Sequence, residues 1–388
     1  MPDVKIFSAD SHVSEPGDLW VKRIDKEFLF RAPRMETRER AGKLEDFFVY
    51  EGFPPHPVAV GLGAAARTGA SRDGEITSTF RDERKGYGDA RPGGWDPAER
   101  LKDQDQDGVI GEILHTTLAF RLYWMKDGGL QRACFRTYND WLAEFCSHSP
   151  KRLVGVPLIS VYDIPEAVKE IRRSNKLDLK GAMMPLSPPA GCPPYWTETY
   201  DPIWAVAQEL DIPLVFHEIT GGGFESPLSP SSYWNPEFQL GMLIRPHEVQ
   251  RTIGQLVLGG VLERFPRLKV ISAENGTDWL PWYVARLERS ARGPYSYPTK
   301  LSLTPIEYFH RNVYFTFINE PHAVGYRGLI GGDSKLMFAT DYPHSASPWP
   351  ESMKVVDRDT ADLSPDTRRK LIHDNLIEVF NLPVPVPA

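Results

Sequence analysis

An aspartate and a histidine, two residues apart, end the first strand-like stretch of this chain. The apolar run 4–9 leads directly into Asp10, Ser11 and His12. Side chains at positions i and i+2 of an extended chain point to the same face, so Asp10 and His12 are expected to converge. A carboxylate oxygen and an imidazole nitrogen at one point suit a divalent metal. The alternative is an Asx-type turn followed by a surface histidine, because Asp and Ser are frequent turn residues.

Four more polar side chains stand where later apolar stretches end. They are, in chain order, His115, His217, Glu274 and Asp341. If these stretches are parallel strands of one barrel, their carboxyl ends open on the face where active sites form. The candidate metal ligands are then Asp10, His12, His217 and Asp341. Two imidazoles and two carboxylates suit Zn²⁺, and also Mn²⁺ or Fe²⁺.

Each of these residues also has a purely structural alternative. His217 could be a core histidine with a backbone partner, Asp341 could cap the next segment, and Glu274 could be an acidic residue at a helix start. His115 and His344 could be loop residues without a role in the site. Five further histidines are expected at the surface or in packing contacts: His56, His148, His310, His322 and His373. His247 is discussed below.

Short apolar stretches alternate with amphipathic ones along most of the chain, which predicts βαβ units and a parallel sheet. The helix predicted over 130–148, for example, carries Phe135, Tyr138, Leu142 and Phe145 at three- and four-residue spacing. Eight strands are expected near residues 4, 109, 153, 179, 212, 268, 313 and 335. Eight such units predict a (β/α)8 TIM barrel. A doubly wound open sheet is the alternative, but no glycine-rich dinucleotide-binding turn supports it.

The segment 16–100 interrupts this alternation directly after the first strand. Its part 54–94 is rich in Gly, Pro and Arg, and 61–74 lacks the Gly-Lys-Ser/Thr ending of a phosphate-binding P-loop. A loop of this length in a compact domain is usually functional or disordered. We therefore expect a distorted single-domain barrel over 1–388, with 16–100 as an inserted cap or lid and 357–388 as a C-terminal helical tail.

The composition is typical of a soluble globular protein, with 41% hydrophobic and 25% charged residues among 388. A formal net charge of -7 and the absence of a basic run predict no nucleic-acid partner. Cys134, Cys146 and Cys192 have no CxxC spacing, which argues against a disulfide framework and a thiolate metal site. No apolar stretch reaches the ~18 residues that cross a bilayer, so we expect a cytoplasmic protein without a membrane partner.

Six segments spread over most of the chain form a specific combination. They are SADSHVSEP (8–16), RLKDQDQDGV (100–109), VFH (215–217), GVLERFPRLKV (260–270), ATDYPH (339–344) and DNL (374–376). Together they resemble the amidohydrolase-related proteins, the superfamily branch that contains aminocarboxymuconate semialdehyde decarboxylase and other metal-dependent decarboxylases. The resemblance implies a (β/α)8 barrel with a metal held by Asp10, His12, His217 and Asp341. Barrels of this family often pair, so we expect a homodimer.

Two positions depart from the pattern of that family. Two-metal members usually carry a Lys or Glu at the end of strand 4, where this chain has Met183 and Met184. One metal is therefore favoured, although Glu274 could hold a second. The decarboxylase branch typically has a His-x-Gly sequence after strand 6, where this chain has Glu274, Asn275 and Gly276. A carboxylate there would repel an ionised substrate carboxylate, but it could serve as a base for water.

These departures favour a metal-dependent hydrolase that activates water against an ester, thioester, amide or similar bond of an apolar or aromatic small molecule. Asp341 would take the proton of water, and Glu274 would assist as a second base or orienting group. His115 or His344 would stabilise the oxyanion. The first alternative is a non-oxidative decarboxylase or related carbon–carbon lyase acting on an aromatic carboxylate, with Asp341 as proton donor. The second is a catalytically silent binding protein on the same fold.

Aromatic residues predict an apolar wall around the substrate. The candidates are Trp95, Trp124, Tyr195, Trp196, Trp234 and Trp279. Trp279 follows the strand that ends at Glu274, and His247 begins a helix on the site side of the chain. Trp279 and His247 are therefore the predicted substrate contacts.

Overall fold

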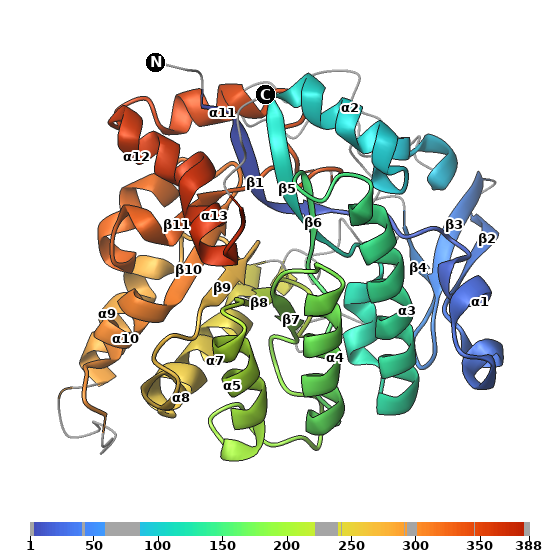
Figure 1. Cartoon of the computed structure of the whole chain (residues 1–388), viewed down its shortest axis with the longest axis horizontal. Helices are drawn as coiled ribbons and strands as arrows, with labels where there is room; N and C mark the ends of the chain where they lie inside the picture. The colour runs from blue at the N-terminus through green and yellow to red at the C-terminus, as the bar shows by residue number, and fades with distance from the viewer. Residues whose placement is uncertain are drawn as a thin grey trace.

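Eight parallel strands form the centre of the protein (Figure 1). The computed structural model describes residues 4–40, 43–58, 86–221, 240–241, 243–290, 292, 301–344 and 346–383. The strands are β1 (Ile6–His12), β5 (Val109–His115), β6 (Leu153–Gly155), β7 (Ala182–Met184), β8 (Leu214–His217), β9 (Val270–Ala273), β10 (Val313–Phe317) and β11 (Leu336–Phe338). They begin close to the eight predicted positions.

Two junctions close these strands into a ring. Strands β1, β5 and β6 pair in that order, and β7 to β11 pair in chain order. The first junction is a parallel bridge between Leu158 and Met183, just beyond β6. At the second, which we call the β1–β11 seam, the Asp341 amide just beyond β11 donates to the Asp10 carbonyl of β1 at 2.9 Å. The predicted (β/α)8 TIM barrel is confirmed.

Helices surround the strands, as the alternating sequence pattern predicts. They are α2 (Pro97–Asp107), α3 (Gly128–Ser147), α4 (Ile164–Lys176), α5 (Asp201–Glu209), α7 (Pro246–Leu258), α8 (Val261–Arg264), α9 (Leu280–Ser290) and α10 (Pro305–Asn312). Aspartates cap three of them, because the side chains of Asp96, Asp127 and Asp163 accept backbone N–H groups of the first turns. Gly260, at φ +74, separates α7 from α8.

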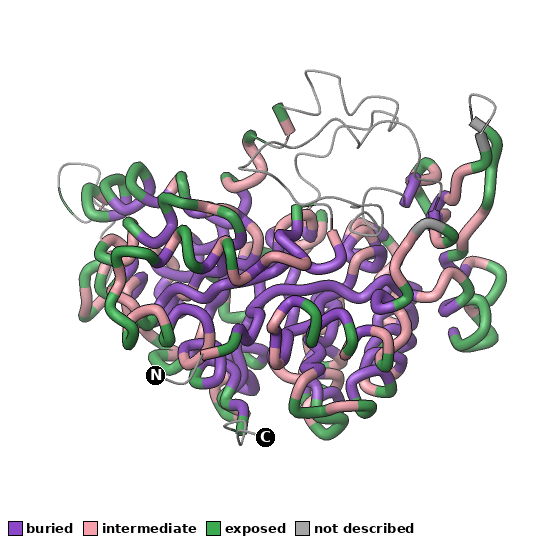
Figure 2. Tube along the Cα trace, turned by 90° about the horizontal axis from the view of Figure 1, so that it is seen from above, coloured by how far each residue is buried: buried purple, intermediate pink, exposed green. Residues whose placement is uncertain are grey.

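The strands lie in the buried centre of the molecule, seen as purple tube in Figure 2. Every residue of β1, β6, β7, β8, β9 and β11 is buried. Parallel strands covered by helices are normally apolar throughout. β1 departs from this rule because Ser8, Asp10, Ser11 and His12 are all buried within it. Buried polar groups require partners, so β1 must lie beside other polar residues.

The segment between β1 and α2 forms a small unit beside the barrel. It contains α1 (Leu19–Arg23), a 3-10 helix (Lys26–Arg31) and an antiparallel sheet of β2 (Arg34–Arg40), β3 (Lys43–Val49) and β4 (His56–Pro57). This unit lies to the right of α3 in Figure 1. The glycine-rich part of the predicted cap, 61–74, lies outside the described residues, so the covering role of 16–100 stays a prediction.

The C-terminal part of the chain is helical, as expected. It consists of α11 (Ser352–Asp359), α12 (Pro365–Arg369), a π-helical turn (Lys370–Asp374) and α13 (Asn375–Phe380). The helical tail therefore begins a few residues before the predicted 357, and 384–388 lie outside the described part. Among the described helices, none combines the length and apolar character that a bilayer-spanning helix needs.

Candidate metal centre

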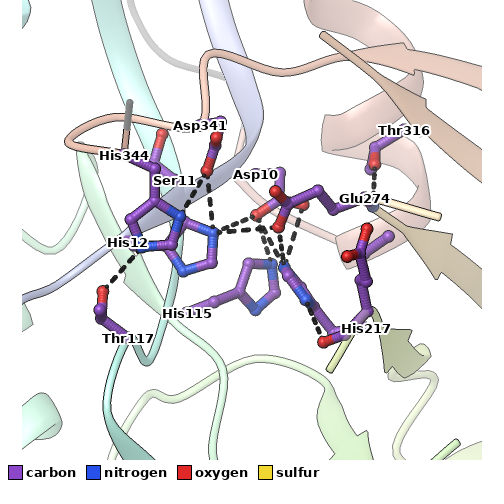
Figure 3. A network of polar contacts seen from close by, with 12 residues as sticks. Asp10, Ser11, His12, His115, Thr117, His217, Glu274, Thr316, Asp341 and His344 are labelled. Atoms are coloured by element: carbon purple, nitrogen blue, oxygen red, sulfur yellow. Dashed lines mark hydrogen bonds and ion pairs between the residues drawn. The ribbon is translucent and has the colours of Figure 1, made fainter. Parts of the chain in front are cut away.

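Seven polar side chains converge at the carboxyl ends of the barrel strands (Figure 3). They are Asp10 and His12 of β1, His115 of β5, His217 of β8, Glu274 after β9, and Asp341 and His344 after β11. All except Glu274 and His344 are buried. The four predicted metal ligands and the four predicted catalytic residues thus lie in one cluster.

The candidate ligand atoms of this cluster are close to one another. His12 Nε2 lies 3.3 Å from Asp10 Oδ1 and 3.2 Å from Asp341 Oδ1. His217 Nε2 lies 3.3 Å from Asp10 Oδ2 and 3.5 Å from Glu274 Oε2. Two overlapping groups have ligand atoms within 4.8 Å of one another: Asp10, His12, His217 and Glu274, and His12, Glu274, Asp341 and His344.

Several of these atoms lack a hydrogen bond. In the described part of the chain, no hydrogen bond of acceptable geometry reaches Asp10 Oδ2, His12 Nε2 or either carboxylate oxygen of Asp341. A buried polar atom without a partner costs roughly 1–3 kcal/mol, and an unpaired charge costs more. A cation bound among these atoms would offset part of this cost. The donor set of two imidazoles and two carboxylates therefore fits a divalent metal.

The two histidines of this set are oriented through their other ring nitrogens. His12 Nδ1 donates to the Thr116 carbonyl at 2.7 Å, and His217 Nδ1 donates to the Glu218 carbonyl at 3.0 Å. Each Nε2 is thereby left facing the carboxylates. A hydrogen bond of this kind selects the tautomer that a histidine needs as a metal ligand.

The carboxylates create a place for positive charge at His12. Burial by itself would lower the pKa of His12, but the neighbouring carboxylates of Asp10 and Asp341 raise that pKa well above its usual value. The pKa of Asp10 lies well below its usual value, because the nearby His217 and His115 outweigh the effect of burial. The carboxylates that stabilise a proton on His12 would equally stabilise a metal ion bound at the same nitrogen.

Burial shifts the pKa values of two other members of the cluster, His115 and Glu274, toward their neutral forms. Burial lowers the pKa of His115 to about 3, although Asp10 works in the opposite direction. His115 Nε2 lies 3.6 Å from Asp10 Oδ1. Burial, together with Asp341 and Glu218, raises the pKa of Glu274 well above its usual value. A neutral His115 can donate a hydrogen bond to a bound ligand, and so can Glu274 in its protonated form.

Two of the carboxylate residues also have unusual backbone conformations. Glu274 and Asp341 have φ values of +53 and +51, in the left-handed region that residues other than glycine rarely adopt. The Glu274 amide is held there by the Thr316 hydroxyl at 3.0 Å, and the Asp341 amide by the seam hydrogen bond. Such conformations cluster at functional sites, where the surrounding structure maintains them.

The structure does not bring the two predicted substrate contacts into this cluster. His247 is exposed, and its Nδ1 donates to the Ile244 carbonyl at 3.0 Å. Trp279 is half-buried, and its Nε1 donates to the Asn275 and Gly276 carbonyls at 3.1 and 2.9 Å. His247 is thus turned to solvent at its helix start, and Trp279 supports the turn that follows Glu274 instead of offering its N–H to a ligand.

Sequence reasoning missed two residues that line the cluster. The Phe120 ring lies 4.4 Å from the His217 ring and 5.6 Å from the His12 ring, measured between centroids. Thr117 Oγ1 lies 3.0 Å from His344 Nε2. Both follow β5 closely, so their position directly after the strand that ends at His115 was the available signal.

Glu15 is a third residue that sequence reasoning missed. Its buried carboxylate accepts hydrogen bonds from the Leu118 and Ala119 amides at 3.0 and 3.2 Å, and from the Thr116 hydroxyl. This holds the loop whose Thr116 carbonyl orients His12. The available signal was its place three residues after His12 in the first motif.

The predicted aromatic wall is only partly placed at the site. Trp124 Nε1 donates to the Ile219 carbonyl at 3.1 Å, two residues after His217, and its ring lies 5.9 Å from that of Phe53. Tyr195 is instead buried in the core, where its hydroxyl donates to the Pro185 carbonyl. Trp234 lies outside the described residues. Trp124 therefore connects the segment after β1 with the end of β8.

Comparisons with known proteins identify the family of this chain and its fold. Residues 53–382 match the family model described as amidohydrolase. The 2-amino-3-carboxymuconate-6-semialdehyde decarboxylase of Dictyostelium discoideum is 24% identical over 291 residues, which cover 74% of this chain and 77% of that protein. A solved amidohydrolase from Mycobacterium avium subsp. paratuberculosis K-10 has a TM-score of 0.76 at 22% identity, covering 98% and 100% of the two chains.

A second solved structure has a ligand named with it. It is a 5-carboxyvanillate decarboxylase from Novosphingobium aromaticivorans DSM 12444, complexed with manganese and 4-hydroxy-3-methoxy-5-nitrobenzoic acid. Its TM-score is 0.60 at 25% identity, and the match covers 73% of this chain and 79% of that one. The family model begins at residue 53, so it includes His217, Glu274 and Asp341 but not the pair on β1.

Proposed function

Because this chain belongs to the amidohydrolase family, we propose that it is a metal-dependent, non-oxidative decarboxylase of an aromatic carboxylate. This reaction was the alternative to hydrolysis in the sequence analysis. Two of the relatives described above are named decarboxylases, whereas hydrolysis has support only from the superfamily as a whole. The comparisons therefore favour the alternative over the initial prediction.

The observation that carries the proposal is the position of Asp341. Its carboxylate is buried, both of its oxygens lack a hydrogen bond among the described residues, and Oδ1 lies 3.2 Å from His12 Nε2. In this proposal one oxygen would contact the metal and the other would face the substrate. We propose that Asp341 is both a metal ligand and the proton donor, and that Asp10, His12 and His217 complete the ligand set.

The metal would supply positive charge that holds the oxygen atoms of the substrate and neutralises the charge developing on them. Asp341 would donate its proton to the ring carbon that carries the carboxylate. The bond between that carbon and the carboxylate then breaks, CO2 leaves, and the bonding electron pair returns to the ring. The ring must accept a proton readily, so we propose a substrate with a hydroxyl next to the carboxylate.

The other residues of the cluster would orient this substrate. The Phe120 ring, which packs on both proposed histidine ligands, offers an apolar face for an aromatic ring. His115 is buried and neutral and has no hydrogen bond in the described structure, so its ring nitrogen is available to a substrate oxygen. His344, stacked on His12 with centroids 3.8 Å apart, would close the opposite side.

The metal remains to be identified by measurement. Two imidazoles and two carboxylates accept Zn²⁺, the metal that the sequence analysis favoured, and also Mn²⁺ and Fe²⁺. Manganese is the metal named in the solved 5-carboxyvanillate decarboxylase. We propose one divalent ion per chain, and elemental analysis of purified and reconstituted protein would identify it. Protein that stays metal-free after incubation with Zn²⁺ and Mn²⁺ would contradict the proposal and favour a silent binding protein.

The reaction itself can be tested with isotopes. The metal-loaded protein is incubated in ¹⁸O-water with hydroxybenzoates that carry ¹³C in the carboxyl group, and Asp341→Asn is the control. We expect ¹³CO2 and the corresponding phenol, with no ¹⁸O in the phenol and little product from the variant. Hydrolysis of an ester or amide panel with ¹⁸O incorporation, and no CO2 from any carboxylate, would overturn the proposal.

Hydrolysis remains the second candidate because of Glu274. Its carboxylate lies 3.5 Å from His217 Nε2, inside the cluster, where the decarboxylase branch typically has a histidine. A carboxylate at this point could accept a proton from water. The ester and amide panel of the same experiment tests this candidate directly.

A further inference from the structure

Arg100 of α2 is a fully buried arginine that contacts β1 and the segment after β11, on the two sides of the β1–β11 seam. Its side chain is 0% exposed, and its Nε donates to Glu112 Oε2 at 2.6 Å. One terminal nitrogen donates to the His12 carbonyl at 2.7 Å, and the other reaches the Tyr342 carbonyl at 3.5 Å. The guanidinium also lies 4.3 Å above the centre of the Tyr342 ring. The Arg100 side chain thus contacts His12, the last residue of β1, and Tyr342, the residue after Asp341.

Barrel stability alone does not explain this arrangement. Removing two opposite charges from water costs about as much as their attraction returns, and apolar side chains of similar volume often serve as well. A guanidinium instead offers five donors in a rigid plane, which can hold several acceptors in a fixed mutual geometry. Here the acceptors are the Glu112 carboxylate and the carbonyls of His12, Gly93 and Tyr342.

Glu112 connects Arg100 to further residues that are next to the proposed ligands in the sequence. Its second oxygen, Oε1, accepts a hydrogen bond from the Ser11 hydroxyl at 3.0 Å. The Ser11 hydroxyl lies 2.9 Å from that of Thr340. Ser11 stands between Asp10 and His12, and Thr340 directly precedes Asp341. Arg100 and Glu112 therefore hydrogen-bond, directly or through the Ser11 hydroxyl, to His12 itself or to residues next to Asp10 and Asp341. These are three of the four proposed ligands.

We propose that Arg100 is a positioning residue that fixes the distance between the β1 ligands and Asp341. It sets the affinity and geometry of the metal centre without touching the metal. The inference rests on the proposed metal centre but not on whether the enzyme decarboxylates or hydrolyses. The proposal predicts that removing the Arg100 guanidinium lowers the metal affinity more than removing another buried cation of the barrel does.

Lys335 provides the matched control. It is a buried cation that immediately precedes β11, the strand that Asp341 follows. Its Nζ donates to the Arg311 carbonyl at 2.8 Å and lies 3.9 Å above the centre of the Tyr314 ring. Lys335→Met therefore removes a buried cation from the opposite end of the same strand. Both Lys335→Met and Arg100→Met are expected to lower Tm.

The experiment measures Mn²⁺ binding by electron paramagnetic resonance, with Tm recorded for every variant. We expect Arg100→Met to weaken binding by roughly 10–100-fold, as losses of outer residues at metal sites do, and to change the spectrum of the bound ion. Arg100→Lys keeps the charge but cannot reach all four acceptors, so an intermediate effect is expected. Lys335→Met should bind within about 3-fold of wild type, since it contacts no residue of the centre.

Each remaining outcome has a defined meaning. Wild-type affinity and spectrum in Arg100→Met, or equal weakening in Lys335→Met, would overturn the positioning role. If Arg100→Met does not fold, Arg100→Lys decides, because wild-type binding in a folded variant would also overturn it. If wild-type protein binds no Mn²⁺ or Zn²⁺, the proposed metal centre fails, and the positioning role fails with it. Metal binding without decarboxylation would overturn the proposed reaction alone.

Discussion

The two sides of the candidate site are held in place in different ways. On the β1–β11 side, which carries Asp10, His12 and Asp341, buried hydroxyls and charged groups connect the two strands. On the β9 side, Glu274 depends on one hydrogen bond from its amide to the Thr316 hydroxyl, and its side chain is 23% exposed. Asp10 and His12 are thus part of a buried barrel strand, whereas Glu274 follows the end of one and is partly exposed.

This difference indicates a division of tasks. A metal requires ligands whose positions vary little, and a buried network that satisfies its members provides such positions. A residue that accepts or donates protons benefits from a raised pKa and from contact with the substrate space. Glu274 has both properties. We therefore expect the β1–β11 side to determine metal affinity, and the β9 side to adjust the reaction.

The largest effect is expected from Asp341→Asn. The amide keeps the size of the side chain and one oxygen for a metal, but it cannot donate a carboxylic proton. Turnover should fall by roughly 10²–10⁴-fold, the usual contribution of a general acid, while Mn²⁺ affinity falls much less. Steady-state kinetics and Mn²⁺ titration of the same preparation measure both. Unchanged turnover would remove Asp341 from the reaction.

His12→Ala should have the next largest effect, and that effect should be on the metal. Loss of a ligand is expected to weaken Mn²⁺ binding by more than the ~10–100-fold seen for outer residues. His373→Ala is a suitable control, because His373 is a partly buried histidine paired with Asp374 at 2.8 Å in the C-terminal helices. Equal metal content in both variants would show that the β1–β11 side does not hold the ion.

Glu274→Gln should have a smaller effect and separates the two candidate reactions. If the enzyme is a decarboxylase, we expect Mn²⁺ affinity to stay within a few-fold of wild type and turnover to fall by about 10-fold or less. Glu320→Gln is the control, since Glu320 is another carboxylate near the strand ends and accepts from the Thr277 hydroxyl at 2.6 Å. A loss of ~10²-fold or more in Glu274→Gln alone would indicate that Glu274 is the base of a hydrolase.

Residues at the strand ends were predictable from the sequence because two local signals coincide there. His217 and Asp341 each interrupt an apolar run at the point where a strand must end, and parallel strands bring such ends together. The same logic placed Glu274 in the cluster. These predictions need no knowledge of distances, because the barrel topology itself brings the ends of the strands together.

Other residues depend on tertiary contacts that no local pattern contains. Arg100 belongs to a charged helix, ERLKDQDQD, in which nothing distinguishes the one buried cation from solvated ones. Its burial depends on Glu112 of the next strand and on carbonyls about 90 and 240 residues away in the sequence. His247 depends on tertiary structure in the same way, because the rotation of the first turn of α7 decides which way its side chain points. The side chain is exposed, and its contact with a substrate stays a prediction.

The smallest effect is expected from a substitution of Asp107. This residue lies outside the metal centre, on the helix α2 that also carries Arg100. Asp107 ends α2 and accepts hydrogen bonds from the Ser352 amide and hydroxyl at the start of α11. Burial raises its pKa to about 6, above that of an unfolded chain. Ionisation therefore disfavours the folded state, and the free energy of unfolding should fall by about 1 kcal/mol between about pH 5 and 8.

Asp107→Asn should abolish this fall, because the amide keeps an acceptor for the Ser352 amide but does not titrate. Urea unfolding of both proteins at the two pH values measures the difference. An equal fall in both proteins would assign it to other groups. Since α2 also carries Arg100, Mn²⁺ affinity of Asp107→Asn at one pH separates two explanations. Unchanged affinity would support the guanidinium as the positioning element, whereas weakened affinity would indicate that the docking of α2 as a whole controls the seam.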